Sequence, residues 1–124
     1  MTEKYSPRIR VDIVAAYSCA GRYTFGIVTN ISSSGLFLES RKLLPVDTEM
    51  SLRLRLPDEQ QQIAVEARVV WSKPATQLCP AGMGMEFVRL SSENRKKLCC
   101  FIQMQLPQGY AEHDQPAMIS IGRP

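Results

Sequence analysis

The chain has 124 residues, of which 44% are hydrophobic and 22% are charged. This composition is typical of a single soluble globular domain and argues against a disordered chain or two domains. The net charge of +3 is too small for wholesale coating of nucleic acid, although it is compatible with an anionic ligand. No apolar run approaches the ~20 residues of a membrane helix, and no apolar core follows residues 1–6 as in a secretory signal. We therefore expect a cytoplasmic protein without membrane insertion.

The N-terminal segment is basic, with Lys4, Arg8 and Arg10 within a short stretch. Residues 9–17 then alternate between apolar and polar side chains, which predicts a half-buried strand that carries Arg8 and Arg10 on its polar face. An arginine can grip a phosphate with two parallel hydrogen bonds and can stack on a purine, which a lysine cannot do. A simple solvated N-terminus remains the alternative for this segment taken alone.

A second strand, in which Tyr23, Phe25 and Ile27 form the apolar set, leads into a polar turn over residues 30–35. In that turn Asn30 offers both a donor and an acceptor, and Ser32 places a hydroxyl on the same face. Gly35 has no Cβ, so a ligand or another backbone can approach it closely. By itself, this turn fits a polar hairpin that caps itself with Asn and Ser hydrogen bonds better than it fits a ligand site.

Four further runs of alternating residues predict strands near residues 36–39, 52–56, 63–71 and 83–87. Turn-forming residues separate them, and the longest connection spans residues 73–80. Six short strands of this kind predict an all-β fold, either a small antiparallel barrel or a sandwich. Within it we expect Trp71 to belong to the core or the barrel rim rather than to a ligand platform. Glu86 is expected to pair with Arg53, Arg55 or Arg68.

One helix is predicted after the strands. Ser91 is a good N-cap and Glu93 suits the first turn, while Leu98, Phe101 and Ile102 share one face at helical spacing. The helix is expected to end near residue 105, before a proline. In the tail that follows, the apolar side chains of Met118, Ile119 and Ile121 offer a docking strip.

The residues available for catalysis are few. The only histidine, His113, lies in the tail, so no Ser-His or Cys-His pair and no two-histidine metal site can form within the folded part. The cysteines form no C-x-x-C pair, and we expect free thiols in a reducing compartment; they are Cys19, Cys79, Cys99 and Cys100. We predict that the protein is not an enzyme.

Three motifs, in this order, resemble the PilZ domain family. They are Lys4-x-x-x-Arg8, then Asn30-x-Ser32-x-x-Gly35, then the run Gly82-Met83-Gly84-Met85-Glu86-Phe87 before the terminal helix. The family pattern is R-x-x-x-R followed by D/N-x-S-x-x-G, and the resemblance covers roughly residues 4–105. The second motif is matched in full.

The resemblance implies a six-stranded antiparallel β-barrel with a C-terminal α-helix, and a receptor for the bacterial second messenger cyclic di-GMP. It implies that Arg8 contacts phosphate and guanine and that Asn30, Ser32 and Gly35 hold a guanine and its neighbouring phosphate. Lys4 is the remaining motif position, and Arg10, Ser33 and Ser34 are further candidates for ligand contact. No cofactor is expected besides the ligand. The expected organisation is a flexible clasp over residues 1–8, the barrel with its helix over residues 9–106, and a flexible tail over residues 107–124.

The sequence departs from the family pattern at Lys4, where the family has arginine. Lysine keeps the charge but loses the planar fork, a difference of roughly 1–2 kcal/mol, or about five- to thirtyfold in affinity. Arg10, on the face of Arg8, is a candidate for partial compensation.

Two functions therefore stay open. The first is a cyclic di-GMP receptor that relays the signal to an unidentified effector protein. The alternative is a PilZ-like interaction protein with weak or no nucleotide binding, for example a type IV pilus or motility adaptor. General single-strand nucleic-acid binding is not expected, because only 7% of the residues are aromatic and most of them fall at positions predicted to be core. The sequence is compatible with either a monomer or a homodimer.

Overall fold

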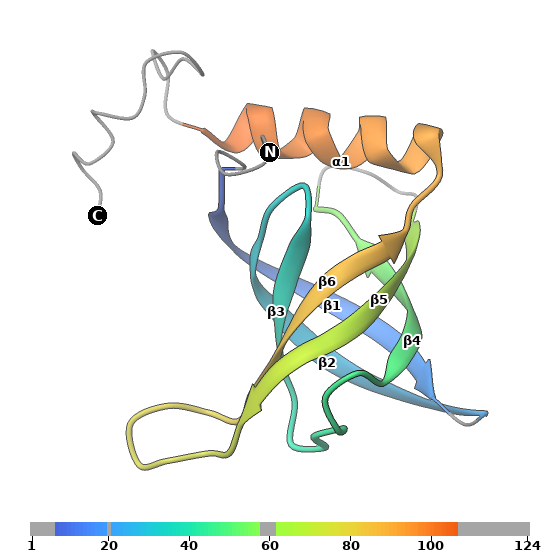
Figure 1. Ribbon diagram of the computed structural model, residues 1–124. Coiled ribbons are helices and arrows are strands. Elements are labelled where there is room, and N and C mark those ends of the chain that lie inside the picture. Colours follow the sequence, from blue (N-terminus) through green and yellow to red (C-terminus); the bar gives the residue numbers. More distant parts are fainter. Residues whose placement is uncertain (1–6, 20, 58–61, 107–124) are drawn as a thin grey trace.

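The computed structural model describes residues 7–19, 21–57 and 62–106, which form a closed antiparallel β-barrel with one helix across an end (Figure 1). In chain order the elements are β1 (Ile9–Cys19), β2 (Arg22–Ile31), β3 (Gly35–Glu39), β4 (Glu49–Arg55), β5 (Gln62–Lys73), β6 (Gly82–Arg89) and α1 (Ser92–Gln105). Around the barrel the order is β1-β2-β3-β6-β5-β4, and β1 and β4 close it. The predicted six-stranded barrel and terminal helix are confirmed. Lys4, residues 58–61 and the tail over residues 107–124 lie outside the described residues.

The inward side chains of the strands fill the barrel. Along β4, and along β5 as far as Val69, every second residue is buried, as the predicted period of two requires; these are Met50, Leu52 and Leu54 on β4, and Ile63, Val65, Ala67 and Val69 on β5. Leu98, Phe101 and Ile102 of α1 join the same core. Because side chains pack the interior, polar chemistry is confined to the outer surface and the barrel ends.

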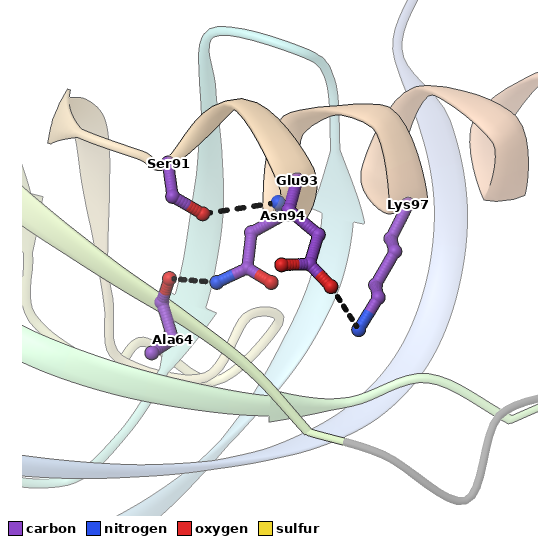
Figure 2. A network of polar contacts seen from close by, with 5 residues as sticks. All are labelled: Ala64, Ser91, Glu93, Asn94 and Lys97. Carbon is purple, nitrogen blue, oxygen red and sulfur yellow. Dashed lines mark hydrogen bonds and ion pairs between the residues drawn. The ribbon is translucent and has the colours of Figure 1, made fainter.

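Polar contacts at its N-terminus fix α1 against the barrel (Figure 2). The hydroxyl of Ser91 accepts a hydrogen bond from the backbone N–H of Asn94 at 3.1 Å, and the side-chain amide of Asn94 donates to the backbone oxygen of Ala64 on β5 at 3.1 Å. Glu93 and Lys97 form an ion pair of 3.8 Å one helical turn apart. The predicted N-cap, buried face and end of the helix at Gln105 are confirmed.

The predicted orientation of β2 is wrong. Tyr23 and Phe25 are 65% and 68% exposed, whereas Gly26 and Val28 face the interior. The reason is space, since a Cβ on Gly26 would lie 2.8 Å from the backbone oxygen of Glu39 and 2.9 Å from the Leu38 side chain. The aromatic rings of β2 therefore lie on the outer surface.

The predicted ion pair of Glu86 forms with Arg68, on adjacent strands β5 and β6. The hydrogen bond from Arg68 to Glu86, followed by the attraction of that carboxylate, raises the pKa of the Arg68 guanidinium. Both side chains remain about 40% exposed, so the pair adds little to stability. Within the described ranges, no helix has the length and apolar character needed to cross a membrane.

We expect Ser91→Ala to lower the free energy of unfolding by about 1 kcal/mol, because the N–H of Asn94 loses its acceptor at the helix N-cap. Urea denaturation followed by circular dichroism measures the effect. Ser92→Ala is the matched control, because Ser92 is exposed and begins the helix without capping it. Equal urea midpoints for the two variants would contradict the capping role.

Candidate functional site

Arg8 connects the N-terminal motif to the polar turn. Its side chain donates from Nε to Oδ1 of Asn30 at 2.7 Å and from Nη1 to the hydroxyl of Ser32 at 3.2 Å. This contact follows from the register of the barrel, in which Ile9 pairs with Ile31 and Arg10 with Asn30. Antiparallel pairing of β1 and β2 thus brings together residues that lie 22 and 24 positions apart in the chain.

The turn after β2 is held by hydrogen bonds around the buried hydroxyl of Ser32. The Ser32 hydroxyl donates to the backbone oxygen of Gly35 at 3.4 Å and accepts from the N–H of Ser34 at 3.2 Å. Its oxygen also lies 3.2 Å from the Ser34 hydroxyl. The backbone N–H of Ser32 also donates to Gly35 O at 2.8 Å. Ser32 therefore both shapes the turn and positions Arg8.

Gly35 is required by close packing rather than by an unusual backbone angle. A Cβ at this position would lie 2.2 Å from the backbone oxygen of Met85 on β6. The turn is held further by the N–H of Phe87, which donates to Ser34 O at 2.9 Å, and by Arg95 of α1, which donates to Ser33 O at 3.3 Å. Strand β6 and helix α1 thus both support the motif.

The partners of Arg8 are neutral, which leaves its charge without a counterion in the described part of the chain. The ion pairs there join other residues, namely Arg68–Glu86, Arg89–Glu66 and Lys97–Glu93. Burial lowers the pKa of the Arg8 guanidinium from its ordinary value, because desolvation disfavours the charged form. The group still stays protonated at neutral pH. A bound anion would compensate this charge.

Arg8 and Asn30 line an open hollow of about 620 Å³ on the outside of the barrel, a volume suited to a small-molecule ligand. The other lining residues are Thr29, Phe37, Trp71 and Lys73. The rings of Phe37 and Trp71 stack with centroids 5.3 Å apart and an angle of 28° between their planes. Lys73 Nζ lies 5.7 Å from the centroid of the Phe37 ring. The hollow therefore combines two cations with an aromatic surface.

Two glycines of β6 make room for this aromatic pair. Gly84 pairs with Phe37 on one side and with Trp71 on the other. A Cβ at Gly84 would lie 2.3 Å from the Trp71 indole, and one at Gly82 would lie 2.2 Å from the Phe37 ring. The two rings therefore meet across a strand that carries no side chains at those positions.

Trp71 was predicted to lie in the core or at the barrel rim, and it does not lie in the core. Its side chain is 48% exposed and faces the hollow. A register shift between Val69 and Trp71 breaks the alternation of β5, so the run of buried residues ends at Val69. The sequence signal that could have indicated this outward aromatic pair is the alternating Gly82-x-Gly84, because glycine within a strand often marks a close approach.

The remaining candidates lie around the motif. Arg10 is exposed on β1 opposite Asn30, and Ser33 and Ser34 form the tip of the turn. Lys4 lies outside the described residues, so the distance between it and Arg8 is not part of the observed geometry. The described segments contain no cluster of three or more His, Cys, Asp or Glu side chains that could hold a metal ion. Cys79, Cys99 and Cys100 are exposed free thiols.

Comparison with known proteins identifies the family. Residues 4–103 match the PilZ domain, and the chain belongs to the PilZ domain family. This match includes Lys4, Arg8 and the whole turn motif. A search of the curated proteins found no match.

Solved structures share the fold at low sequence identity. The Bacillus subtilis inhibitor of motility MotI/DgrA has a TM-score of 0.72 and 19% identity, and the match covers 85% of this chain and 52% of that protein. The PilZ domain of YcgR from Escherichia coli, solved with cyclic di-GMP, has a TM-score of 0.66 and 11% identity over 85% of this chain and 92% of that one. MrkH of K. pneumonia, in a complex with cyclic di-GMP, has a TM-score of 0.64 and 15% identity, and the match covers 85% of this chain and 54% of MrkH. The chain thus spans about half the length of MotI/DgrA and MrkH.

We expect Gly84→Ala to displace the Trp71 ring, because the added methyl group would occupy the space of the indole. Trp71 is the only tryptophan, so intrinsic fluorescence reports on this ring alone. The emission should shift to longer wavelength and acrylamide quenching should increase as the ring leaves Phe37. Ser72→Ala, a change at the exposed neighbour of Trp71, is the control. Unchanged emission of the Gly84 variant would contradict the proposed packing across β6.

Proposed function

We propose that the protein is a cytoplasmic receptor for cyclic di-GMP that relays the level of this second messenger to an effector protein, without enzymatic activity of its own. The observation that carries the proposal is Arg8, whose side chain is held by Asn30 and Ser32 at the edge of an aromatic hollow and has no counterion among the described residues. Cyclic di-GMP offers the phosphate groups that such a cation binds and the purine rings that such a surface stacks.

In this proposal each residue has a distinct role. Arg8 binds a phosphate, and Asn30 forms hydrogen bonds with a guanine edge through its amide. Ser32 and Gly35 hold the turn so that Ser33 and Ser34 can contact the ligand. Trp71, stacked on Phe37, supplies a surface for a guanine, and Lys73 adds a second positive charge beside it. Arg10 is a further contact on the face of Arg8.

The N-terminal residues complete the site in this proposal. Residues 1–8 act as a clasp that closes over the nucleotide, with Lys4 in the position of the first family arginine. Residues 9–106 form the folded domain. The family match and the cyclic di-GMP complexes of YcgR and MrkH support the choice of ligand.

Monomer and homodimer both stay compatible with the site, because Arg8, the turn and the aromatic pair all come from one chain. The inhibitor of motility among the similar structures suggests motility as one process to test.

Isothermal titration calorimetry with cyclic di-GMP tests the proposal directly. We expect micromolar or tighter binding, and a loss of roughly ten- to hundredfold in affinity for Arg8→Ala, because charge-assisted hydrogen bonds contribute about 1.5–3 kcal/mol. Trp71→Ala should lose a stacking contribution of about 1–3 kcal/mol. Arg53→Ala is the control, because Arg53 lies on β4 and does not line the hollow. Absence of heat and of NMR shifts at high ligand concentration would overturn the proposal.

Lys4→Arg tests the clasp. We expect about five- to thirtyfold tighter binding, because the guanidinium restores two parallel hydrogen bonds and a stacking surface. Lys42→Arg makes the same chemical change at an exposed position after β3 and should leave the affinity unchanged. Equal affinities of the Lys4 variant and the wild type would show that Lys4 does not contact the nucleotide.

A further inference from the structure

The outer surface of β1 and β2 carries an apolar patch that the nucleotide site does not use. We call Val14, Ala16, Tyr23, Phe25 and Ile27 the β1–β2 patch. Strand pairing places these side chains on one face, since Val14 pairs with Ile27, Ala16 with Phe25 and Ser18 with Tyr23. Val14 is 51% exposed and the two aromatic residues are about two-thirds exposed. Such a contiguous exposed group marks an interaction surface more often than an isolated apolar residue does.

The patch is concave. Val14, Phe25 and Ile27 line a hollow of about 390 Å³ together with the end of β3 and the segment after it, which contribute Glu39, Ser40, Arg41 and Lys42. A hollow of this size accepts one or two bulky side chains. A flat lipid surface would leave it unfilled.

Cationic side chains flank the patch on both sides. Arg53 on β4 pairs with Ala16, and the neighbouring outward residue of that strand is Arg55. Arg41 and Lys42 flank the opposite side. None of these four side chains forms an ion pair with the described residues. Among the described residues, the acidic groups beside the patch are Glu39, which pairs with Ile27, and Asp12, two residues before Val14 on β1, so positive charge predominates there.

We propose that the β1–β2 patch and its flanking cations form a docking surface for an acidic segment of another protein. A bulky apolar side chain of that segment fills the hollow, and carboxylates on either side pair with Arg53 and Arg55 and with Arg41 and Lys42. Complementary charge of this kind orients a partner and accelerates its association. A second copy of the chain is disfavoured, because a symmetric contact places like surfaces opposite each other and brings the arginines together.

The proposed docking surface does not rest on the proposed nucleotide binding, although it adjoins the nucleotide site. On β2 and β3 the pair Ile27–Glu39 belongs to the patch region, while Asn30–Phe37 belongs to the nucleotide hollow. A docked protein would therefore lie beside a bound nucleotide on the same two strands.

Site-specific photo-crosslinking of the full chain in its native cells tests the docking surface. p-Benzoylphenylalanine replaces Phe25, where its ring projects outward, and Leu78, which is 92% exposed on a distant loop, is the control position. We expect a crosslink from position 25 only, to a peptide of a different protein in which Asp or Glu residues flank apolar ones. The double variant Arg53→Glu/Arg55→Glu should reduce the crosslink at least tenfold while keeping wild-type affinity for cyclic di-GMP by calorimetry.

Every other outcome overturns the docking proposal. These outcomes are no crosslink from position 25, a crosslink to a second copy or to residues 107–124, a crosslinked peptide without acidic residues, or a crosslink that the double variant retains. Arginine-dependent sedimentation with phosphatidylcholine–phosphatidylserine vesicles would assign the surface to a membrane instead. Failure of the proposed receptor function would appear separately, as loss of calorimetric binding by the wild type.

Discussion

The close approach of β3 to β6 at Gly35 is the constraint on which the proposed nucleotide site depends. Because the backbone oxygen of Met85 lies where a Cβ would be, the chain can enter β3 only with glycine at this position. This entry fixes the turn in which the Ser32 hydroxyl is buried and contacts Gly35, Ser34 and Arg8. On β6, Gly84 and Gly82 lie one and three residues before Met85 and carry no side chains, so this strand accommodates Trp71 and Phe37. Polar and aromatic parts of the site therefore both derive from close contacts to β6.

Sequence patterns predicted what depends on local periodicity and capping. The buried positions of β4, most of β5 and α1 follow from apolar spacing, and the Ser91 cap follows from residue type. The turn motif could be found because all of its members lie within six consecutive residues. Its contact with Arg8 depends on the register of β1 against β2, which the alternation within each strand does not give.

The errors have two physical causes. Register shifts interrupt β2 between Val28 and Asn30 and β5 between Val69 and Trp71, and beyond each of these two shifts the alternation of inward and outward residues no longer holds. Trp71 follows such a shift and is directed to the surface, although the alternation before it is regular. For Phe25 the cause is different, because the interior beside Gly26 is already filled by Leu38. Neither bulge position nor interior space can be obtained from the alternation of a single strand.

The electrostatics of Arg8 favour the binding of an anionic ligand more than they stabilise the folded domain without one. Arg68 has a carboxylate partner that raises its pKa, whereas Arg8 has neutral partners and a pKa lowered by burial. A guanidinium in this position is held in place but not neutralised, so the interaction that would stabilise it most is one with an external anion. Preorganisation by Asn30 and Ser32 reduces the conformational entropy that such binding would otherwise lose.

The bulge in β2 also divides the outer surface of that strand into two chemically different regions. Before the shift between Val28 and Asn30, the outward residues are apolar, and after it Asn30 faces the nucleotide hollow. A regular strand would have continued the alternation and placed Thr29 rather than Asn30 in line with Ile27. One irregularity thus joins an apolar surface suited to protein contact directly to a polar site suited to a nucleotide. Because both regions lie on the same pair of hydrogen-bonded strands, a ligand at one can contact or repel a partner at the other without any rearrangement of the barrel.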